Sequence, residues 1–376
     1  MAKFEVPVVP ITVEPHPNAD RIEIAVFAGY RSVVRKGQFR DGDLVAYIPE
    51  GAVVPEALLR EIGLWDDAAA KGRLAGPAGT RVRIMRFRGQ TSQGLCYPAR
   101  VGWSGGQDVT AELGITKYIP PIPACMSGRV VAVGLDHTLR FDVEPWQRYP
   151  DVLREGELVV LTEKIHGTQC CVGVFPDGDA TPAAVASKGL AARGLAFDMS
   201  ASENAQNLYL RAVQQHRVVE KVRDGFASTL ARSAYEGYVG EPVFVLGEVF
   251  GAGVQKGFDY GARAATDETL GFRVFAVYIG WPQHGRFVHA GGLSTLCQRL
   301  DLGVVPEVWR GPFSIEEVRR HADGQEGVSG EGRHIREGVV IVPAVERRDD
   351  ASGLGRVCLK LVSEEYLHGT DGTEVD

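Results

Sequence analysis

Short apolar runs separated by turn-forming residues fill the chain up to about residue 115. Residues 11–34 contain apolar runs split by the turn formers His16-Pro17-Asn18-Ala19-Asp20, and another turn precedes the run at residues 44–49. Short runs of this kind between turn signals predict β-strands. A short helix is expected only at residues 55–64, where Pro55 suits the first turn. Several short strands with one helix favour a small barrel, with the OB-fold as the leading candidate.

A proline-rich segment at residues 118–123 divides the chain. Its prolines cannot lie inside a helix or a central strand, so we expect a semi-rigid, extended linker over residues 118–134. We therefore assign residues 1–117 to the barrel and residues 135–370 to a second domain. Residues 371–376 are expected to form a polar tail that frays.

The second domain mixes strand and helix patterns. Apolar runs predict strands at residues 156–175, 241–251, 271–280, 337–344 and 356–363. Between them, Val219, Val222, Phe226 and Leu230 recur at the spacing of one helix face, and Ser200 with Glu203 has the form of a helix-capping box. Strands gathered at both ends of a helical middle favour an α+β domain with antiparallel sheets.

Composition limits the function classes. The chain has 376 residues, is 44% hydrophobic and 24% charged, and shows no apolar run long enough to span a membrane. Its start lacks the layout of a signal peptide, which favours the cytoplasm. The six cysteines form no CxxC pair and no Cys/His ligand spacing, so a structural zinc is not expected. The net charge of -7 argues against an evenly basic surface, although a local basic patch can still bind nucleic acid.

Common catalytic motifs are missing from the sequence. It contains neither a P-loop nor a dinucleotide-binding glycine motif after a strand. It also lacks the HExxH motif and the serine elbow of common hydrolases. A P-loop ATPase and a dinucleotide-dependent oxidoreductase are therefore poorly supported.

Four charged residues lie within or at the ends of otherwise apolar strands: Lys164, Glu248, Glu337 and Lys360. Burial and neighbouring cations lower the pKa of a strand-end lysine, which makes Lys164 a candidate nucleophile. A buried carboxylate needs a cation, a metal or hydrogen bonds, so Glu248 and Glu337 are candidates for the same site. Each residue alone is also compatible with a turn lysine, a structural ion pair or an edge-strand acid. Their combination favours a site, because perturbed charges cluster where chemistry occurs.

Other candidates have similar structural alternatives. Lys188 and Lys360 can each meet a phosphate as a point charge or remain solvated. One of the rings Phe272, Phe275 and Tyr278 can stack on a base, although most rings in such strands belong to the core.

An arginine stripe marks the end of the predicted barrel. Its members are Arg81, Arg83, Arg86 and Arg88. On one flat strand they would divide between the two faces, and a bulge or turn near Met85 would bring them together. We expect them either to contact the nucleic-acid backbone or to form a solvated sheet face.

Five motifs in chain order join these residues. They are EKIHGT at residues 163–168, LGEVFG at 246–251, FRVF at 272–275, EGVV at 337–340 and LKL at 359–361. This series resembles that of the covalent nucleotidyltransferases, namely DNA ligases, RNA ligases and mRNA capping enzymes. EKIHGT resembles the RNA ligase 2 branch with its KxHG motif. PHPNADRIEIA (15–25), GDLVAYIPEGAVVP (42–55) and WQRYP (146–150) resemble the Deinococcus-type RNA ligases, so the likeness covers nearly the whole chain.

The resemblance implies a fold and an activity. The fold would be α+β, with an N-terminal OB-like β-barrel followed by a nucleotidyltransferase (ATP-grasp-like ligase) domain of antiparallel sheets and flanking helices. The activity would be that of an ATP-dependent RNA ligase that seals 5′-phosphate/3′-OH breaks through a lysyl-AMP intermediate. Nicks in duplexes with an RNA 3′-OH strand are the favoured substrate. The partner would be RNA or an RNA-containing nicked duplex, with no membrane and no obligate protein partner.

The resemblance also implies residue roles. Lys164 would attack the α-phosphorus of ATP, and Lys360 would contact the α-phosphate. Nucleotide binding would fall to Glu163, Ile165, Gly167, Lys188, Glu248, Phe275 and Lys360, and Mg²⁺ or Mn²⁺ would be held by Glu337 and Glu248. Two positions depart from the family pattern. Cys358 replaces the first lysine of a Lys-x-Lys pair, and Ala276 replaces an aspartate after the ring, which keeps Tyr278 as an alternative to Phe275.

Three alternatives stay open. A DNA ligase and a GTP-dependent capping-type guanylyltransferase share the catalytic fold. A non-catalytic OB-fold nucleic-acid-binding protein is the third, in which Lys164 is merely a turn lysine.

Overall fold

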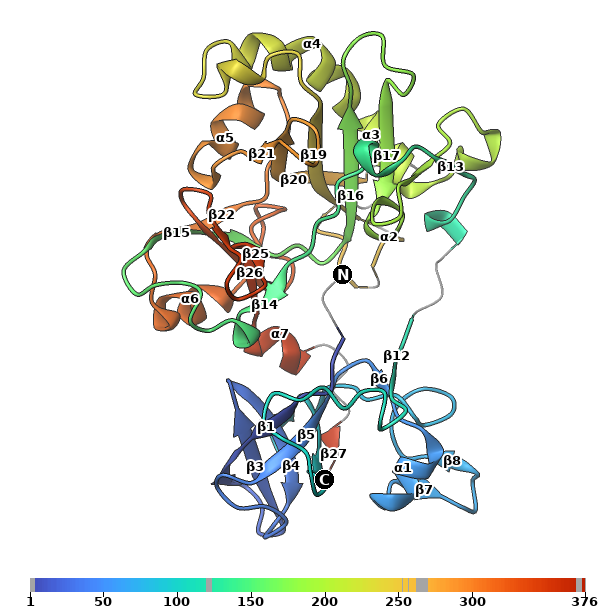
Figure 1. Cartoon of the computed structure of the whole chain (residues 1–376), viewed down its shortest axis with the longest axis vertical. Coiled ribbons are helices and arrows are strands. Elements are labelled where there is room, and N and C mark those ends of the chain that lie inside the picture. Colours follow the sequence, from blue (N-terminus) through green and yellow to red (C-terminus); the bar gives the residue numbers. More distant parts are fainter. Residues whose placement is uncertain are drawn as a thin grey trace. The chain divides into compact units, whose positions relative to one another are not determined.

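The computed structural model describes residues 4–119, 124–251, 253–255, 257–261, 270–369 and 374–375 (Figure 1). The chain divides into two compact units. The larger unit spans Ile122–Tyr366, and the smaller unit combines Ala2–Pro121 with Leu367–Asp376. Among the helices of the described ranges, none has the length and apolar character needed to cross a membrane.

The smaller unit consists of short strands and one helix. Its sheets have the orders β1-β5-β11, β2-β3-β4, β10-β9-β27, β12-β6 and β7-β8. The strands are β1 Val8–Pro10, β2 Thr12–Pro15, β3 Ile22–Phe27, β4 Tyr30–Arg35, β5 Leu44–Pro49, β6 Ala52–Val53, β7 Trp65–Asp66, β8 Lys71–Gly72, β9 Met85–Phe87, β10 Gln90–Ser92, β11 Gly94–Pro98, β12 Thr116–Lys117 and β27 Glu374–Val375. Helix α1, Glu56–Glu61, follows Pro55 as its N-cap, since the fixed φ of proline suits a helix start.

Three expectations for this unit need correction. The arginine stripe is not one strand: β9 covers only Met85–Phe87, and residues 82–84 form no strand. The tail does not wholly fray, because Glu374–Val375 pair in parallel with β9; residues 371–373 and 376 lie outside the described residues. The linker expected over residues 118–134 is shorter, since Val130–Ala132 form β13 and pair with β18 of the larger unit. The prolines of that linker lie outside the described residues.

The larger unit is built on two five-stranded sheets, with orders β14-β26-β23-β15-β22 and β17-β16-β19-β20-β21. The first contains β14 Glu144–Pro145, β15 Leu158–Glu163, β22 Glu307–Pro312, β23 Gly338–Pro343 and β26 Leu359–Val362. The second contains β16 Thr168–Val174, β17 Ala183–Ser187, β19 Val243–Phe250, β20 Gly271–Ile279 and β21 Arg286–Phe287. All pairings in both sheets are antiparallel except that of β14 with β26.

Helices and short pairs complete the larger unit. The helices are α2 Lys188–Ala191, α3 Leu208–Gln215, α4 Val218–Leu230, α5 Ala290–Arg299, α6 Ile315–Ala322 and α7 Glu364–Gly369, which continues past residue 366. The 3-10 turns are η1 Ala124–Met126, η2 Leu135–His137, η3 Trp146–Arg148, η4 Ser202–Asn204 and η5 Glu236–Tyr238. The short pairs join β13 to β18 (Leu195–Phe197) and β24 (Arg348–Asp349) to β25 (Gly355–Arg356).

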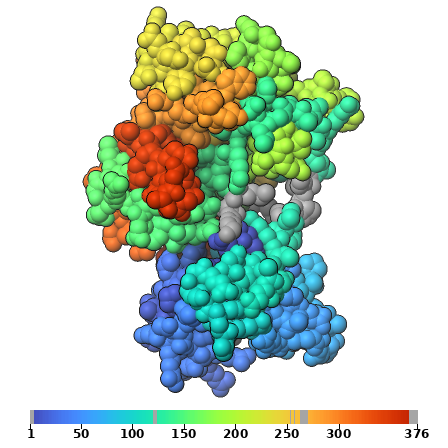
Figure 2. All heavy atoms as spheres, in the orientation of Figure 1, coloured from blue at the N-terminus to red at the C-terminus, as the bar shows by residue number. Residues whose placement is uncertain are grey.

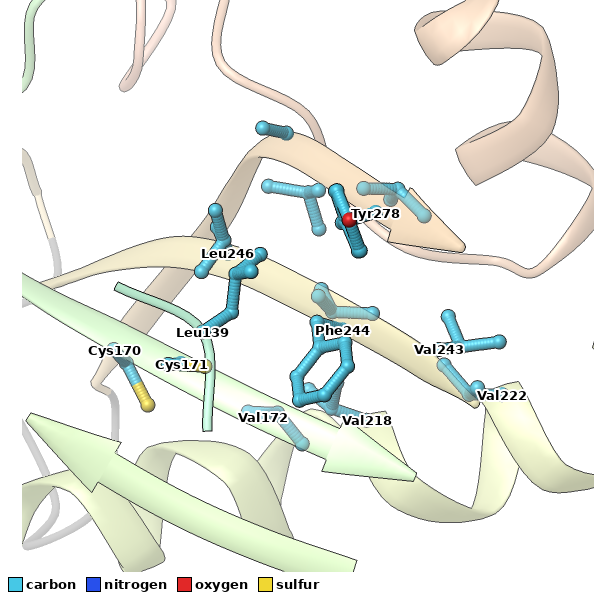
Figure 3. Close-up of a cluster of buried hydrophobic side chains, with 14 of the residues drawn as sticks. Leu139, Cys170, Cys171, Val172, Val218, Val222, Val243, Phe244, Leu246 and Tyr278 are labelled. Atoms are coloured by element: carbon cyan, nitrogen blue, oxygen red, sulfur yellow. The ribbon is translucent and has the colours of Figure 1, made fainter. Parts of the chain in front are cut away.

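The core explains why the strands of the second sheet read as nearly continuous apolar runs. The adjacent Cys170 and Cys171 are 0% and 2% exposed although they face opposite ways, because both faces of the sheet are covered. On one face, Val218 of α4 lies beside Phe244 and Val222 beside Val243 (Figure 3). The helix predicted from its apolar spacing is therefore confirmed as α4.

The predicted capping box is wrong. The Ser200 hydroxyl donates to the Asp198 carboxylate at 2.6 Å instead of capping a helix. Helix α3 is capped by Asn207, whose side-chain oxygen accepts from the backbone N–H of Tyr209 and Leu210 at 3.0 and 3.2 Å.

A surface ion pair ties the late strands to the start of β15. The Arg347 guanidinium Nε lies 2.6 Å from the Glu157 carboxylate, and Figure 2 shows these red and green regions side by side. This pair therefore holds the segment around Arg347 next to Glu157, the residue that precedes β15.

Candidate functional site

A cavity of about 340 Å³ lies in the larger unit and is lined by strands of both five-stranded sheets. The predicted residues Glu163, Lys164, Ile165, Lys188, Glu248, Phe275 and Lys360 all line it. Gly167 and Glu337 are not among its lining residues, although both contact residues that are. The fold thus brings together side chains that lie up to about two hundred positions apart in the sequence.

Lys164 follows the last residue of β15 and is anchored by the strand beside it. Its backbone N–H donates to the Gly338 carbonyl at 2.9 Å, and its Nζ donates to Glu337 Oε1 at 2.6 Å. Gly338 has a φ of 148°, and a Cβ there would lie 2.2 Å from the Leu361 carbonyl oxygen. Only glycine therefore allows β26 to pass so close behind the Lys164–Glu337 pair.

Gly167 makes the turn after Lys164 possible. A Cβ on Gly167 would lie 2.3 Å from the Val249 carbonyl oxygen and 2.9 Å from Cγ of Glu248. Glycine at this position lets the start of β16 pack directly on β19, next to the Glu248 side chain.

His166 lies in the middle of that turn and makes contacts that the sequence alone did not predict. Its Nδ1 lies 3.4 Å from Glu337 Oε2 and 3.1 Å from the Tyr366 hydroxyl. Its backbone N–H donates to the Tyr260 hydroxyl at 2.8 Å. Lys164 therefore binds one oxygen of Glu337, and His166 lies near the other without a hydrogen bond to it.

The charges around Lys164 perturb one another. Burial raises the pKa of Glu248 to about 8; the nearby Lys164 charge opposes this shift and that of Glu337 adds to it. Burial lowers the pKa of Lys360, and the charges of Lys164 and Lys188 lower it further. Burial also disfavours the Glu337 carboxylate, yet Lys164 and His166 bring the pKa of Glu337 below its ordinary value. Such opposed shifts within one cavity are typical of functional sites.

Glu163 is a buried acid with one unused oxygen. Its side chain is fully buried, and its Oε2 accepts a hydrogen bond from the Gly327 backbone N–H at 2.7 Å. Its Oε1 is buried without a hydrogen-bond partner among the described residues. Burial raises the pKa of Glu163 to about 7, while the Gly327 hydrogen bond opposes that shift. A buried acceptor of this kind fits a donor on a ligand.

A β-bulge aims Phe275 at the cavity. Leu246 pairs with Ala276 and Gly247 with Val274, so Phe275 is the extra residue on β20. Phe275 lines the cavity, with its ring centroid 5.3 Å from that of Phe141. Tyr278 is buried in the core, and its hydroxyl donates to the Pro282 carbonyl at 3.0 Å. Of the two candidate rings, only Phe275 is thus available to a molecule in the cavity.

Three alternate residues of one late segment, Arg356, Cys358 and Lys360, line the same wall. Arg356 is tied to Glu346, with Nε to Oε2 at 2.9 Å, and its guanidinium lies 3.8 Å from the Phe287 ring centroid. Cys358 is a buried thiol, whose pKa burial raises to about 11. Lys360 thus contributes a second cation beside Arg356 to the lining of the cavity.

Sequence reasoning missed Asp142 and Arg356. The Lys188 Nζ lies 2.5 Å from Asp142 Oδ1, and both residues line the cavity. Neither Asp142 nor Arg356 belongs to a recognisable motif, so only three-dimensional pairing reveals them.

The four arginines of the stripe differ in their surroundings. The Arg81 guanidinium lies 4.0 Å from the centroid of the Tyr118 ring, so Arg81 holds the chain where it leaves the smaller unit. Arg83 and Arg88 are exposed, and Arg86 is half-buried in β9. The structure therefore separates Arg81 from the other three.

The acids of the cavity suit a hard divalent cation. Among the described residues, no group of three or more His, Cys, Asp or Glu side chains is placed to hold a metal by itself. Glu337 Oε2 is buried without a hydrogen-bond partner in those residues, and Mg²⁺ and Mn²⁺ prefer one or two carboxylates completed by phosphates and waters. Glu248 and Glu337 fit such a partial ligand set.

Solved structures of Naegleria gruberi RNA ligase share this fold. The ligase with PPi is 23% identical, covers 98% of each chain and has a TM-score of 0.74. A lysine-to-alanine variant with ATP and Mn is 22% identical, covers 97% of this chain and 98% of that one, and has a TM-score of 0.73. A lysine-to-methionine variant with AMP and Mn gives the same values. Among curated proteins, none matches this chain.

Family models assign both parts of the chain. An OB-fold domain model matches residues 8–99, so the barrel predicted at the N-terminus is confirmed as an OB-fold. The RNA ligase model matches residues 157–362, more than half of the chain, and this match covers both five-stranded sheets except β14. The predicted α+β order of an OB-fold followed by a ligase domain is therefore confirmed, and the chain belongs to the RNA ligase family.

Proposed function

We propose that this protein is an ATP-dependent RNA ligase that works through a lysyl-AMP intermediate on Lys164. The observation that carries the proposal is the placement of the Lys164 amine at a cavity that Lys188, Glu248 and Lys360 also line, with its Nζ 2.6 Å from Glu337. The ATP, AMP and Mn of the Naegleria structures support the same choice of nucleotide and metal.

The residues of the cavity divide the chemistry between them. The Lys164 Nζ forms a P–N bond to the α-phosphorus of ATP while the bond to pyrophosphate breaks. A 5′-phosphate oxygen then takes the AMP from the lysine, and a 3′-OH displaces AMP to seal the break. Such transfers need positioning and charge neutralisation more than acid–base chemistry. Lys360 and Lys188 supply the cations that contact phosphate oxygens.

The lysine must lose its proton before it attacks. A free lysine is mostly protonated at pH 7. Glu337 accepts a hydrogen bond from Lys164 Nζ, so it holds the ammonium in place. A divalent metal held by Glu248 and Glu337 with waters and phosphates would offset the charge on the α-phosphate oxygens.

Glu163 and Phe275 form the base pocket in this proposal. Phe275 stacks on the adenine ring, and Glu163 Oε1 accepts from its exocyclic amine, which satisfies a buried oxygen that has no partner among the described residues. Guanine presents a carbonyl oxygen at the matching position, which the Glu163 carboxylate would repel. We therefore expect labelling with ATP to exceed labelling with GTP at pH 8, where the acid is ionised.

The substrate proposal follows the sequence resemblance. The KxHG form of the motif and the N-terminal segments favour a Deinococcus-type ligase that seals nicks with an RNA 3′-OH, and the OB-fold would hold the strand beside the break. Gel assays of nicked duplexes with RNA or DNA on each side of the nick test this choice. Equal sealing of an all-DNA nick would replace it with the DNA ligase alternative.

The central experiment is covalent labelling. Wild-type protein incubated with α-³²P-ATP and Mn²⁺ should retain label after denaturation, and Lys164→Ala should retain none. Lys117→Ala, a change at an exposed lysine of the smaller unit, should label like the wild type. Label that persists on Lys164→Ala would refute the assignment of the nucleophile, and unlabelled wild-type protein would favour a non-catalytic binding role.

A further inference from the structure

The β9–β10 hairpin of the smaller unit carries two of the arginines proposed to bind RNA. Phe87 pairs with Gln90, which leaves Arg88 and Gly89 as a two-residue turn. Arg88 has a φ of 45° and Gly89 a φ of 85°, values typical of the turn that matches the twist of a hairpin. Arg88 is thus a non-glycine residue in the left-handed region, and such a residue persists only where surrounding contacts hold it.

The PHPNAD segment, Pro15–Asp20, provides those contacts. His16 is 6% exposed, and its Nε2 lies 2.9 Å from the Phe87 carbonyl oxygen. Its Nδ1 accepts from the Asn18 backbone N–H at 3.1 Å, so the ring proton lies on Nε2, which donates to Phe87. The Asn18 side-chain amide donates to the Arg88 carbonyl at 3.1 Å. One loop therefore holds two consecutive carbonyls of the turn.

The arginines of this hairpin differ from others in the same unit. Arg31, Arg60 and Arg100 each pair with a carboxylate, namely Glu14, Glu56 and Glu61. Arg88 has no carboxylate within ion-pair distance among the side chains that the structure describes, whereas Arg86 lies opposite Glu374 in the pairing of β9 with β27. Cations without a protein anion are available to phosphate oxygens, whose contacts supply most of the affinity for nucleic acid.

We propose that His16 and Asn18 are positioning residues for RNA binding. They fix the Arg88-Gly89 turn so that the exposed Arg88 meets the phosphate backbone in one arrangement. The inference rests on the proposed function, because it takes RNA as the partner. A cation held in place before binding loses less freedom when RNA binds, so loosening the turn weakens binding although every charge remains.

The test measures binding of the full-length chain to a labelled nicked duplex with an RNA 3′-OH strand, without ATP, at several salt concentrations. Asn18→Ala and His16→Ala should weaken binding roughly 5-fold to 10-fold, and the slope of log affinity against log salt should fall by about 0.7–0.9 for each phosphate that the variant no longer neutralises. Arg88→Ala should give the same fall in slope. His16→Gln, whose side-chain amide can donate to the Phe87 carbonyl, should restore binding.

The controls separate positioning from general damage. Gln38→Ala removes another side-chain bond to the backbone, from Arg35 N at 3.2 Å, away from the hairpin, and should change neither affinity nor slope. Adenylate formation on Lys164 should be unchanged in every variant. Asn18 is exposed, so Asn18→Ala tests the idea even if His16→Ala fails to fold.

Two results would overturn the inference. One is an Asn18→Ala variant with unchanged affinity, or with weaker binding at an unchanged salt slope. The other is an Arg88→Ala variant that binds and seals RNA like the wild type; in that case the proposed function stands while the positioning role falls. Absence of both adenylate and RNA binding in the wild type would instead remove the proposed function, and this inference with it.

Discussion

The cavity of the larger unit and the arginine hairpin of the smaller unit use charge in opposite ways. In the cavity, Lys164 and Glu337 are one-quarter and one-tenth exposed and bind each other at 2.6 Å. In the hairpin, Arg88 is exposed and has no carboxylate partner among the described side chains. Buried charges change one another's pKa and need exact partners, whereas exposed charges act at longer range and are screened by salt. Chemistry is therefore expected in the first region and salt-sensitive binding in the second.

The largest effect should come from breaking the buried pair. Glu337→Ala removes the partner of Lys164 Nζ and one proposed metal ligand, so adenylate formation should fall roughly 100-fold or more. Radiolabel retained by the protein measures it. Glu331→Ala changes an exposed acid of the preceding loop and should leave labelling intact. Equal labelling of the two variants would argue against a role for the buried pair.

A smaller effect, on stability, should follow from filling the turn after Lys164. Gly167→Ala places a Cβ 2.3 Å from the Val249 carbonyl oxygen, so the free energy of unfolding should fall by about 1–3 kcal/mol. Urea denaturation gives this value. The matched control is Gly189→Ala in α2, where a Cβ meets nothing within 4 Å and helix propensity favours alanine. Similar decreases for both would mean that the close approach of β16 to β19 is unimportant.

The pH dependence of stability should contain a part that is due to Glu163, beside the part due to Glu248. Its pKa is about 7 in the folded protein and near the ordinary 4.5 when unfolded, so the folded state binds more protons between these values. The free energy of unfolding should therefore fall as pH rises from about 4.5 to about 7, by up to about 3 kcal/mol from this group. Glu163→Gln should lack this fall. Denaturation of both proteins at pH 5 and pH 8 measures the difference, and parallel curves would disprove it.

The smallest effects are expected from two arginine variants, which should differ in what they change. Arg83→Ala removes an exposed cation, and the salt slope of RNA binding should fall by about 0.7–0.9 with unchanged stability. Arg81→Ala removes a cation stacked 4.0 Å over Tyr118, and stability should fall by about 0.5–1 kcal/mol with the slope unchanged. If both variants lower the slope equally, Arg81 also contacts RNA and the division between the arginines is wrong.

Candidate residues next to regular strands were easier to predict from the sequence than residues at irregular positions such as a bulge. Lys164 follows the last residue of β15 and Lys360 lies in β26, and the apolar runs around both residues predicted these strands. Phe275 and Tyr278 were not separable, because the bulge that distinguishes them arises from the pairing of β20 with β19. For the arginine stripe, one flat strand and a bulge or turn near Met85 were both left open, since alternation alone does not reveal that residues 82–84 leave the sheet.

Partnerships across the chain were the least predictable part. Asp142 could not be predicted as a cavity residue. Its partner Lys188 lies 46 positions later, and no sequence pattern links the two. His16 and Asn18 were noted as a turn, yet their contacts lie about 70 residues away. Periodicity reports which face a residue occupies and gives no information about what meets it there.

The order of strands in the first sheet has a consequence for protein synthesis. β15, which leads to Lys164, lies between β22 and β23, and β23 is followed by β26. The ribosome makes each of these neighbours well after β15, and the last of them ends at Val362. A nascent chain therefore cannot enclose the amine until translation is almost finished. Products that end before β26 should therefore lack the adenylate proposed for Lys164.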